Sequence, residues 1–216
     1  MKLSLKKLTK TEINRLMSHR TKDLPKLSGF AHLIRELRYH EFSRQSIGII
    51  LVSVFCFFTP LEPILLYQIE AGYVIAIIGL TIRLIASGYV LKNKELSTTG
   101  PYSYVRHPLY TGNLILLIGL AIINGLWWSF LIGFLFAIFY YPTAIEYEDR
   151  KLRQLFPADW PQWAEKTPAL WPKNGSQGSD RGLSFAEWSF SKSLKSNYEP
   201  VIVIYVLTWL ILLSQR

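Results

Sequence analysis

Residues 100–112, GPYSYVRHPLYTG, bring together side chains that could bind a charged ligand: Arg106, His107 and three tyrosines. Pro108 fits the first turn of a helix, where its missing N–H needs no partner. His107 before it is therefore expected to be extended, not helical. Arg106 and His107 are thus predicted to lie on bent backbone at the start of an apolar helix. Polar backbone at such a place must be buried in protein or face a watery cavity.

The second group of candidate residues is acidic. Glu148 lies four residues before Leu152 and eight before Phe156, so the three share one face of a helix. Glu146 is about 160° away from Glu148 on such a helix and is not expected to share its role. Two alternatives stay open. Asp149 and its neighbours could simply balance nearby cations, and residues 100–112 could be an interfacial loop whose arginine meets lipid phosphates.

The composition indicates an integral membrane protein, because half of the residues are hydrophobic while the net charge is +9. Residues 1–44 carry eleven Lys and Arg and no apolar core, so no cleavable signal peptide is expected. Anionic lipid explains this charge, and we expect no nucleic acid as a partner. The single cysteine, Cys56, cannot form an internal disulfide.

The elements that must position these residues are apolar runs at 47–58, 71–91, 109–123, 126–141 and 201–213. They predict an all-α membrane bundle of about five transmembrane helices. The Asn124-Gly125 turn makes the third and fourth helices antiparallel neighbours, and a helix over 143–155 would continue the fourth. Glu148 is therefore expected to face the bend at 106–110. Arg83 within the second run is either functional or snorkels to the surface.

The expected organisation has five parts. A basic segment, 1–44, includes a surface helix at about 30–42. Two membrane helices occupy 45–91, a core with both candidate groups occupies 92–172, a flexible loop occupies 173–199, and a last membrane helix occupies 200–216. Lys and Arg are concentrated before the first run and after the fourth, which predicts a multi-pass protein with its N-terminus and the site at the cytosolic ends of the helices.

These residues carry a resemblance. The motif GPYSYVRHPLYTG, the helical hairpin and then Glu148-Asp149, followed by Leu152, Phe156, Trp160 and Trp163, resemble the isoprenylcysteine carboxyl methyltransferase family, whose wider relatives include phospholipid N-methyltransferases. The resemblance covers roughly residues 79–172. It implies a membrane methyltransferase that uses S-adenosyl-L-methionine and methylates a lipidic or small hydrophobic acceptor within the bilayer.

The resemblance also implies site residues. It assigns catalysis to Arg106, His107 and Glu148, no metal, and cofactor binding to Lys94, Glu95, Leu96, Ser97, Tyr102, His107, Pro108, Leu109, Tyr110 and Glu148. Arg106 or backbone N–H groups at the helix start can take the cofactor's carboxylate. Glu148 can hold its ammonium or a ribose hydroxyl, and the tyrosines can contact its adenine and sulfonium.

Several residues depart from the family pattern. Asp149 replaces a second glutamate, and Ala144 stands where the prenylcysteine enzymes have an arginine implicated in substrate binding. The acceptor therefore stays open among a prenylated thiol's carboxylate, a phospholipid amine, a small thiol and a lipid hydroxyl, as does the oligomeric state. Rival interpretations are an NADPH-dependent enzyme similar to membrane sterol reductases, against which Leu109 and Asn113 count, and a non-catalytic membrane protein that kept the fold.

The predicted orientation can be tested by cysteine labelling in intact cells. With Cys56 replaced by serine, Ser18→Cys and Ser176→Cys should resist a membrane-impermeant maleimide, because both positions are predicted to be cytosolic. Glu62→Cys, in the connection that contains no Lys or Arg, should be labelled and serves as the control. Labelling of either serine position from outside would overturn the orientation.

Overall fold

The computed structural model describes residues 20–21, 24–61, 66–90, 94–173 and 188–215, which contain helices and no strand. The all-α prediction is therefore confirmed for this part of the chain. Ser18, Ser176 and Glu62, the three labelling positions, lie outside the described residues. The long helices are α2 (Gly29–Tyr39), α3 (Glu41–Phe57), α4 (Leu66–Ser87), α5 (Pro108–Asn124), α6 (Trp127–Leu155) and α9 (Glu199–Ser214). The short ones are η1 (Gly100–Ser103), α7 (Trp160–Lys166) and α8 (Phe190–Asn197).

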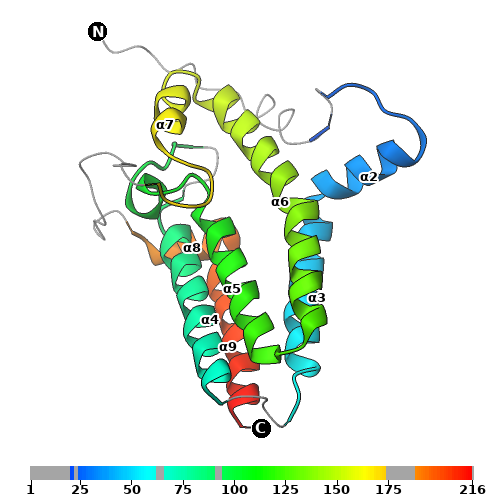
Figure 1. Cartoon of the computed structure of the whole chain (residues 1–216). Coiled ribbons are helices and arrows are strands. Elements are labelled where there is room, and N and C mark those ends of the chain that lie inside the picture. The colour runs from blue at the N-terminus through cyan, green and yellow to red at the C-terminus, as the bar shows by residue number, and fades with distance from the viewer. Residues whose placement is uncertain (1–19, 22–23, 62–65, 91–93, 174–187, 216) are drawn as a thin grey trace.

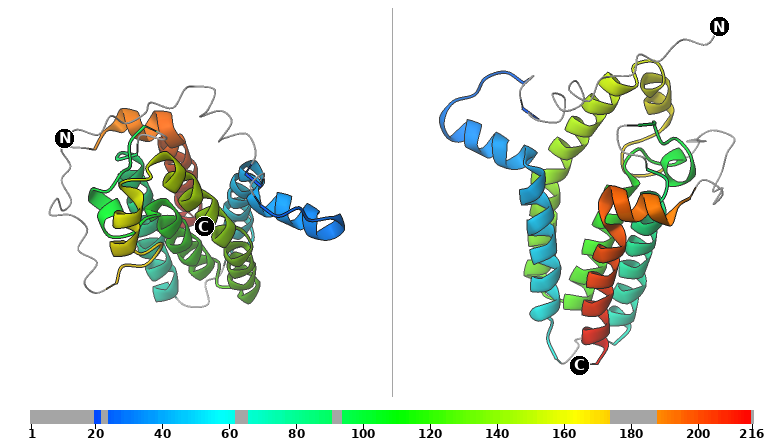
Figure 2. Two further views of the ribbon diagram at one scale, coloured as in Figure 1. Left: turned by 90° about the horizontal axis from the view of Figure 1, so that it is seen from above. Right: turned by 180° about the vertical axis from the view of Figure 1, so that it is seen from behind.

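The helices form two groups around a shared apolar core. Helices α4, α5 and α9 run side by side, and α3 runs along α6 (Figure 1 and Figure 2). Side chains from both groups meet in one buried cluster, which includes Phe55 of α3, Leu120 of α5, Tyr140 of α6 and Val206 of α9. Helix η1, α7 and the polar end of α6 lie together at one end of the bundle (Figure 1).

Glycines bring α4 and α5 into backbone contact. A Cβ atom added at Gly79 would lie 2.5 Å from the backbone nitrogen of Leu116, and one added at Gly119 would lie 2.5 Å from that of Ala76. A Cβ atom added at Gly72 or Gly112 would lie 2.9 or 2.8 Å from the backbone oxygen of Gly119 or Gly79, respectively. Small residues are what allow membrane helices to approach so closely. Since α5 begins at the candidate site, this seam of glycines fixes the height of the site relative to α4.

Two helical segments, Tyr67–Ser87 and Trp127–Leu155, are long and apolar enough to cross a membrane by length and composition. Shorter apolar segments occupy Arg44–Phe57, Pro108–Asn124 and Glu199–Ser214. Many large apolar side chains on these helices are exposed, such as Val74, Ile78, Leu135, Ile204 and Leu212. That pattern suits contact with lipid. The number of spans, five, stays a prediction.

Helix α6 continues past its apolar segment, as the sequence predicts. It is joined to α5 by Gly125, whose φ of 71° is left-handed and suits glycine. Pro142 lies inside α6, and Figure 1 shows the helix changing direction part-way along. Proline removes a helical N–H donor and its ring crowds the preceding turn, which accounts for the bend. Arg38 supports this region, since its Nε donates to the Phe139 carbonyl at 2.9 Å.

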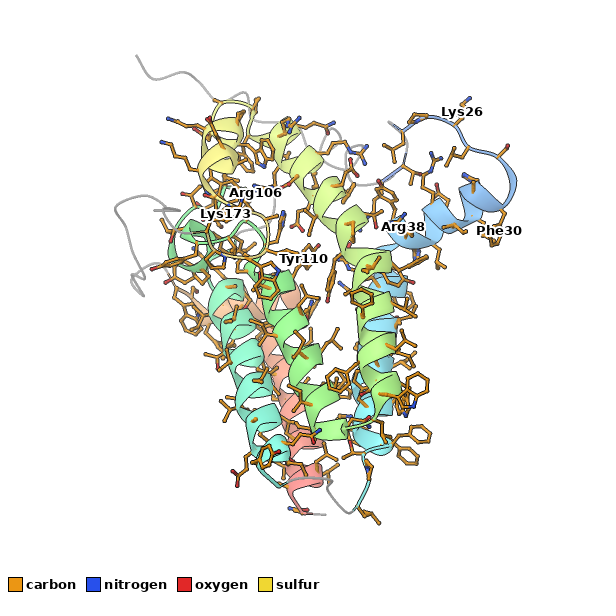
Figure 3. The ribbon with its side chains drawn as sticks, in the orientation of Figure 1. Lys26, Phe30, Arg38, Arg106, Tyr110 and Lys173 are labelled. Atoms are coloured by element: carbon orange, nitrogen blue, oxygen red, sulfur yellow. The ribbon has the colours of Figure 1, made fainter. Side chains whose placement is uncertain are left out.

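Two expectations for the N-terminal and C-terminal parts need correction. The surface helix expected over 30–42 is two helices, since α2 ends at Tyr39 and α3 already begins at Glu41. Helix α2 projects from the bundle with Phe30 exposed (Figure 3). The flexible loop expected over 173–199 is helical at 190–197, because α8 packs on α4, where Ser193 and Ser87 share a 2.6 Å hydrogen bond. Residues 174–187 lie outside the described part.

Arg83 does not snorkel to the surface. It is buried in α4, and its guanidinium donates to both carboxylate oxygens of Glu199 on α9, at 2.6 and 2.9 Å. Its third nitrogen donates to Asn113 of α5. Because a buried charge must be paired, this cluster joins α4, α5 and α9 at one level. Sequence periodicity could not reveal it, since Glu199 is 116 positions away along the chain.

The glycine seam predicts where small substitutions are costly. Gly79→Ala and Gly119→Ala should each destabilise the protein by about 1–3 kcal/mol, because a methyl group would overlap the backbone of the facing helix. Gly133→Ala on α6 is the matched control, since its nearest neighbour would be 3.9 Å away. Thermal unfolding in one detergent measures all three. Equal midpoints for the seam and control variants would contradict the close contact.

Candidate functional site

The bend before α5 has the form that the prolines predict, with one difference. Pro108 is the first residue of α5 and His107 precedes it as the N-cap. His107 is not helical, but its ψ of 62° lies outside the extended range that was expected. Its backbone carbonyl instead turns inward and accepts from the N–H groups of Tyr110 and Thr111, at 3.0 and 3.1 Å. The bend is thus part of the cap of α5.

A strap formed by residues 167–170 lies across this bend. The backbone N–H groups of Arg106 and His107 donate to the carbonyls of Pro168 and Ala169, at 2.8 and 3.0 Å. The Thr111 hydroxyl donates to the Leu170 carbonyl at 2.6 Å. The polar backbone at the helix start is therefore satisfied within the protein. The N–H groups of Arg106 and His107, which precede the helix start, are therefore not available to a carboxylate.

Arg106 is engaged along its whole guanidinium group. Its Nε and one terminal nitrogen donate to the carboxylate of Asp149, at 3.3 and 2.9 Å. The other terminal nitrogen donates to the carbonyls of Ala164 and Thr167, at 3.1 and 2.6 Å. Arg106 thus joins the start of α5, the polar end of α6 and the strap. Figure 3 shows it with Tyr110 at the end of the bundle where α7 lies. This geometry is that of a positioning residue.

Asp149 is the partner of both motif residues. It lies on residues 143–155 of α6, beyond the apolar segment, and its Oδ1 is 3.0 Å from Nε2 of His107. Burial raises the pKa of the Asp149 carboxyl, but hydrogen bonds from His107 and Arg106 outweigh burial and hold the pKa below its usual value. An ionised Asp149 can only accept, so Nε2 of His107 carries a proton. The other ring nitrogen, Nδ1, lies 3.9 Å from Glu148.

Tyr110 links these groups to Glu148. Its ring stacks with those of His107 and Tyr141, whose centroids lie 5.6 and 5.5 Å away. Its hydroxyl donates to Oε2 of Glu148 at 2.8 Å. The Glu148 side chain is 45% exposed, whereas that of Asp149 is 17% exposed. Glu148 therefore faces the bend, as helical geometry predicts, and keeps room for a ligand.

Glu146 lies elsewhere, also as predicted. Its carboxylate accepts from the Tyr39 hydroxyl at 2.8 Å and pairs with Arg150 at 3.1 Å. These partners tie α2 to α6 outside the Arg106–Tyr110 bend. The pair of Glu146 and Glu148 is thus a natural comparison of two acids on one helix with different surroundings.

The remaining predicted cofactor residues form a separate group. Lys94 and Glu95 are exposed, with Glu95 3.7 Å from Lys192. Ser97 donates to the Tyr89 carbonyl at 2.9 Å. Tyr102 is buried beside Tyr89, with Leu109 packed on the same cluster. Burial, Glu148 and Glu199 raise the pKa of Tyr102 well above its usual value, so its hydroxyl stays protonated. Leu96 is half-buried. Among the described residues, no hydrogen bond from residues 94–97 reaches Arg106, His107 or Glu148.

Sequence reasoning missed Arg44. It belongs to α3, and its guanidinium carbon lies 5.1 Å from the centre of the Tyr110 ring. No local pattern marks this arginine among the eleven cations of residues 1–44, because its role depends on how α3 packs against α5 and α6. The strap was also missed, because its contacts join segments that are far apart along the chain, such as Thr111 and Leu170.

The two adjacent acids should differ in their effect on stability. Asp149→Asn should destabilise the protein by about 1.5–3 kcal/mol, because it removes the counter-charge from Arg106. Glu148→Gln, on a half-exposed side chain, should change it by no more than about 0.5 kcal/mol. Thermal unfolding in detergent at neutral pH measures both.

The ion pair of Asp149 and Arg106 predicts how the stability of the protein depends on pH. Since the folded pKa of Asp149 is lowered from 3.8, its contribution to stability is present above that value and is lost as the pH falls through the folded pKa. The unfolding midpoint of the wild type should therefore converge on that of Asp149→Asn only in acid below pH 3.8. Convergence near neutral pH, or equal loss in Glu148→Gln, would contradict the assignment.

Comparison with curated proteins finds two relatives named for metal resistance. The cobalt-zinc-cadmium resistance protein CzcN of Cupriavidus metallidurans is 39% identical over 118 residues, 53% of this chain and 52% of the relative. The nickel-cobalt-cadmium resistance protein NccN of Alcaligenes xylosoxydans xylosoxydans is 38% identical over 104 residues, 48% of each chain. The chain spans about half the length of these relatives.

Family comparison identifies the region that contains the site. No solved structure matches the chain. The sequence model of the phospholipid methyltransferase family matches residues 64–159, a range that includes the bend, the α5–α6 hairpin and both acids of the site. This match confirms the resemblance drawn from the motifs. Over residues 64–159 the chain is thus similar to the phospholipid methyltransferase family.

Proposed function

We propose that this protein is a membrane methyltransferase that uses S-adenosyl-L-methionine and acts on a lipidic or membrane-embedded acceptor. The observation that carries the proposal is the position of Glu148. Within the methyltransferase family domain it is held against Tyr110 and His107 by a 2.8 Å hydrogen bond, yet nearly half of its side chain stays accessible. A carboxylate so placed is available to a ligand.

The residues of the site fit this cofactor. Its ammonium and ribose hydroxyls are donors, and the accessible carboxylate of Glu148 is an acceptor for either. Its sulfonium is a cation, which the faces of aromatic rings attract, and Tyr110, which binds Glu148, stacks with the rings of His107 and Tyr141. When bound, S-adenosyl-L-methionine would supply an electrophilic methyl group.

The chain's own residues would act by positioning. Asp149 holds His107 in the tautomer with the proton on Nε2, so that Nδ1 faces Glu148. Tyr110 fixes one oxygen of Glu148 and leaves the other free. The strap and Arg106 keep the start of α5 from shifting relative to α6. Methyl transfer requires an in-line approach, so rigid positioning of this kind supplies much of the acceleration.

The proposal places the site at the cytosolic ends of the helices. The basic charge on this side of the predicted membrane helices supports that orientation. A water-soluble donor would then arrive from the cytosol and a lipidic acceptor from the bilayer. The exposed apolar side chains of α4, α6 and α9 are consistent with a bilayer around the bundle.

The names of the two relatives concern metal resistance, and we do not extend that property to this chain. Among the described residues no group of three or more His, Cys, Asp and Glu side chains could hold a metal ion. The proposal therefore rests on the family domain and on the cluster around Tyr110.

Cofactor binding tests the proposal. The wild type in detergent should bind S-adenosylhomocysteine and not NADPH, measured by titration calorimetry. Glu148→Gln and His107→Ala should each weaken binding about ten- to a hundredfold, since a charge-assisted contact contributes about 1.5–3 kcal/mol.

Glu146→Gln is the matched control, because that acid lies on the same helix but pairs with Tyr39 and Arg150. The affinity of Glu146→Gln for S-adenosylhomocysteine should stay within about twofold of that of the wild type. Equal losses for Glu146→Gln and Glu148→Gln would mean that the acids act as a diffuse charge. Binding of NADPH in place of S-adenosylhomocysteine would overturn the methyltransferase assignment.

A further inference from the structure

Arg44 brings a third helix to the candidate site. It lies near the start of α3, and its guanidinium carbon is 5.1 Å from the centre of the Tyr110 ring. Tyr110 in turn binds Glu148 through its hydroxyl. The Arg44 side chain is only 13% exposed. A guanidinium so enclosed at a site of methyl transfer needs a reason, because burying a charge is costly unless it is paired.

The protein itself gives Arg44 little pairing. Its nearest acid is Glu41, with a closest distance of 4.0 Å, which is longer than a hydrogen bond. Glu41 has other donors, since Arg20 binds it directly and Gln45 donates to it at 3.3 Å. Within the described part of the chain, no hydrogen bond from the Arg44 guanidinium to a protein acceptor is found. Its ring contact with Tyr110 leaves the N–H donors at the edge of the guanidinium unused.

Arg106, the other arginine at the site, differs from Arg44 in its hydrogen bonding. Every nitrogen of the Arg106 guanidinium donates to Asp149 or to a backbone carbonyl. Arg106 has therefore no free edge to offer an anion. Arg44 has one, and it lies beside the same tyrosine. Of the two arginines at the site, Arg44 is the one whose chemistry is incomplete without a ligand.

The charge around Tyr110 is arranged as a pair. Glu148 accepts at the tyrosine hydroxyl, and Arg44 lies over the tyrosine ring. Glu148 attracts Arg44 electrostatically, but no ion pair within 4.0 Å joins them in the described structure. A ligand with a cationic and an anionic end could meet both groups at once. A ligand with only an anionic head could meet Arg44 alone.

We propose that Arg44 binds the anionic oxygen group, a carboxylate or phosphate, of a ligand at this site. The planar fork of a guanidinium matches such a group with two parallel hydrogen bonds. The inference rests on the proposed function for the name of the ligand. The anion belongs either to the amino-acid end of the methyl donor or to the acidic head of a lipidic acceptor, and the experiment separates these sources.

The first arm compares two adenosyl ligands. S-adenosylhomocysteine carries the amino-acid carboxylate and 5′-methylthioadenosine does not. If the anion is the donor's, Arg44→Gln weakens S-adenosylhomocysteine about ten- to a hundredfold and leaves 5′-methylthioadenosine within about twofold. Arg44→Lys keeps the charge but not the fork, so an intermediate affinity is expected. Arg153→Gln, which removes an exposed arginine from α6, is the control and should leave the affinity for both ligands unchanged.

The second arm compares oleate with oleyl alcohol, which differ in the acidic head alone. If the anion belongs to the acceptor, the wild type binds oleate more tightly than oleyl alcohol. Arg44→Gln should then weaken oleate binding about ten- to a hundredfold and leave the affinity for both adenosyl ligands unchanged. Thermal unfolding confirms that each variant is folded, and Arg44→Lys carries the test if Arg44→Gln is not.

The outcomes are decisive for Arg44. Loss of either preference in Arg44→Gln, or in Arg44→Lys if only that variant folds, supports the proposal and names the source of the anion. A variant that keeps the wild-type preference in both arms, or a wild type with neither preference, overturns it. A wild type that binds no adenosyl ligand contradicts the proposed function, while the oleate arm still decides whether Arg44 binds an anion.

Discussion

The ion pair between Arg106 and Asp149 is the interaction on which the site depends. It joins the first residues of α5 to the polar end of α6, at a level where α6 has already bent away from its apolar segment. Without it, the hydrogen bonds from His107 to Asp149 and from Tyr110 to Glu148, at 3.0 and 2.8 Å, would be left to hold the polar end of α6 against the bend. The same guanidinium binds the strap, so one side chain sets the relation between three segments far apart in the sequence.

The site therefore divides its polar residues by task. Arg106 and Asp149 are satisfied by each other, by His107 and by backbone, which is the behaviour of a buried network that specifies a structure. Glu148, at the Tyr110 hydroxyl, and Arg44, over the Tyr110 ring, are satisfied less completely. Under the proposed function, stability and ligand binding thus fall to neighbouring residues, and in the case of the two acids to consecutive ones.

Local spacing was enough to predict the helical bends and faces. The prolines predicted the start of α5, Asn124-Gly125 predicted its end, and the interval from Glu148 to Phe156 placed Glu148 toward Tyr110. What could not be predicted depends on contacts between distant segments. The partners of Arg83 and Arg44 come from other helices, and Asp149 pairs with Arg106, which is 43 positions earlier along the chain. A single sequence carries no record of such pairings.

The glycine seam between α4 and α5 also limits how the sequence can change in length. Gly79 must lie against α5, and Arg83, four residues later, must reach both Glu199 and Asn113. Inserting one residue between them would rotate Arg83 by about 100° and shift it by about 1.5 Å along the axis. The buried Glu199 would then lose its counter-charge. The spacing between Gly79 and Arg83 is thus fixed by the structure. Substitutions between these two residues should be tolerated more readily than insertions or deletions.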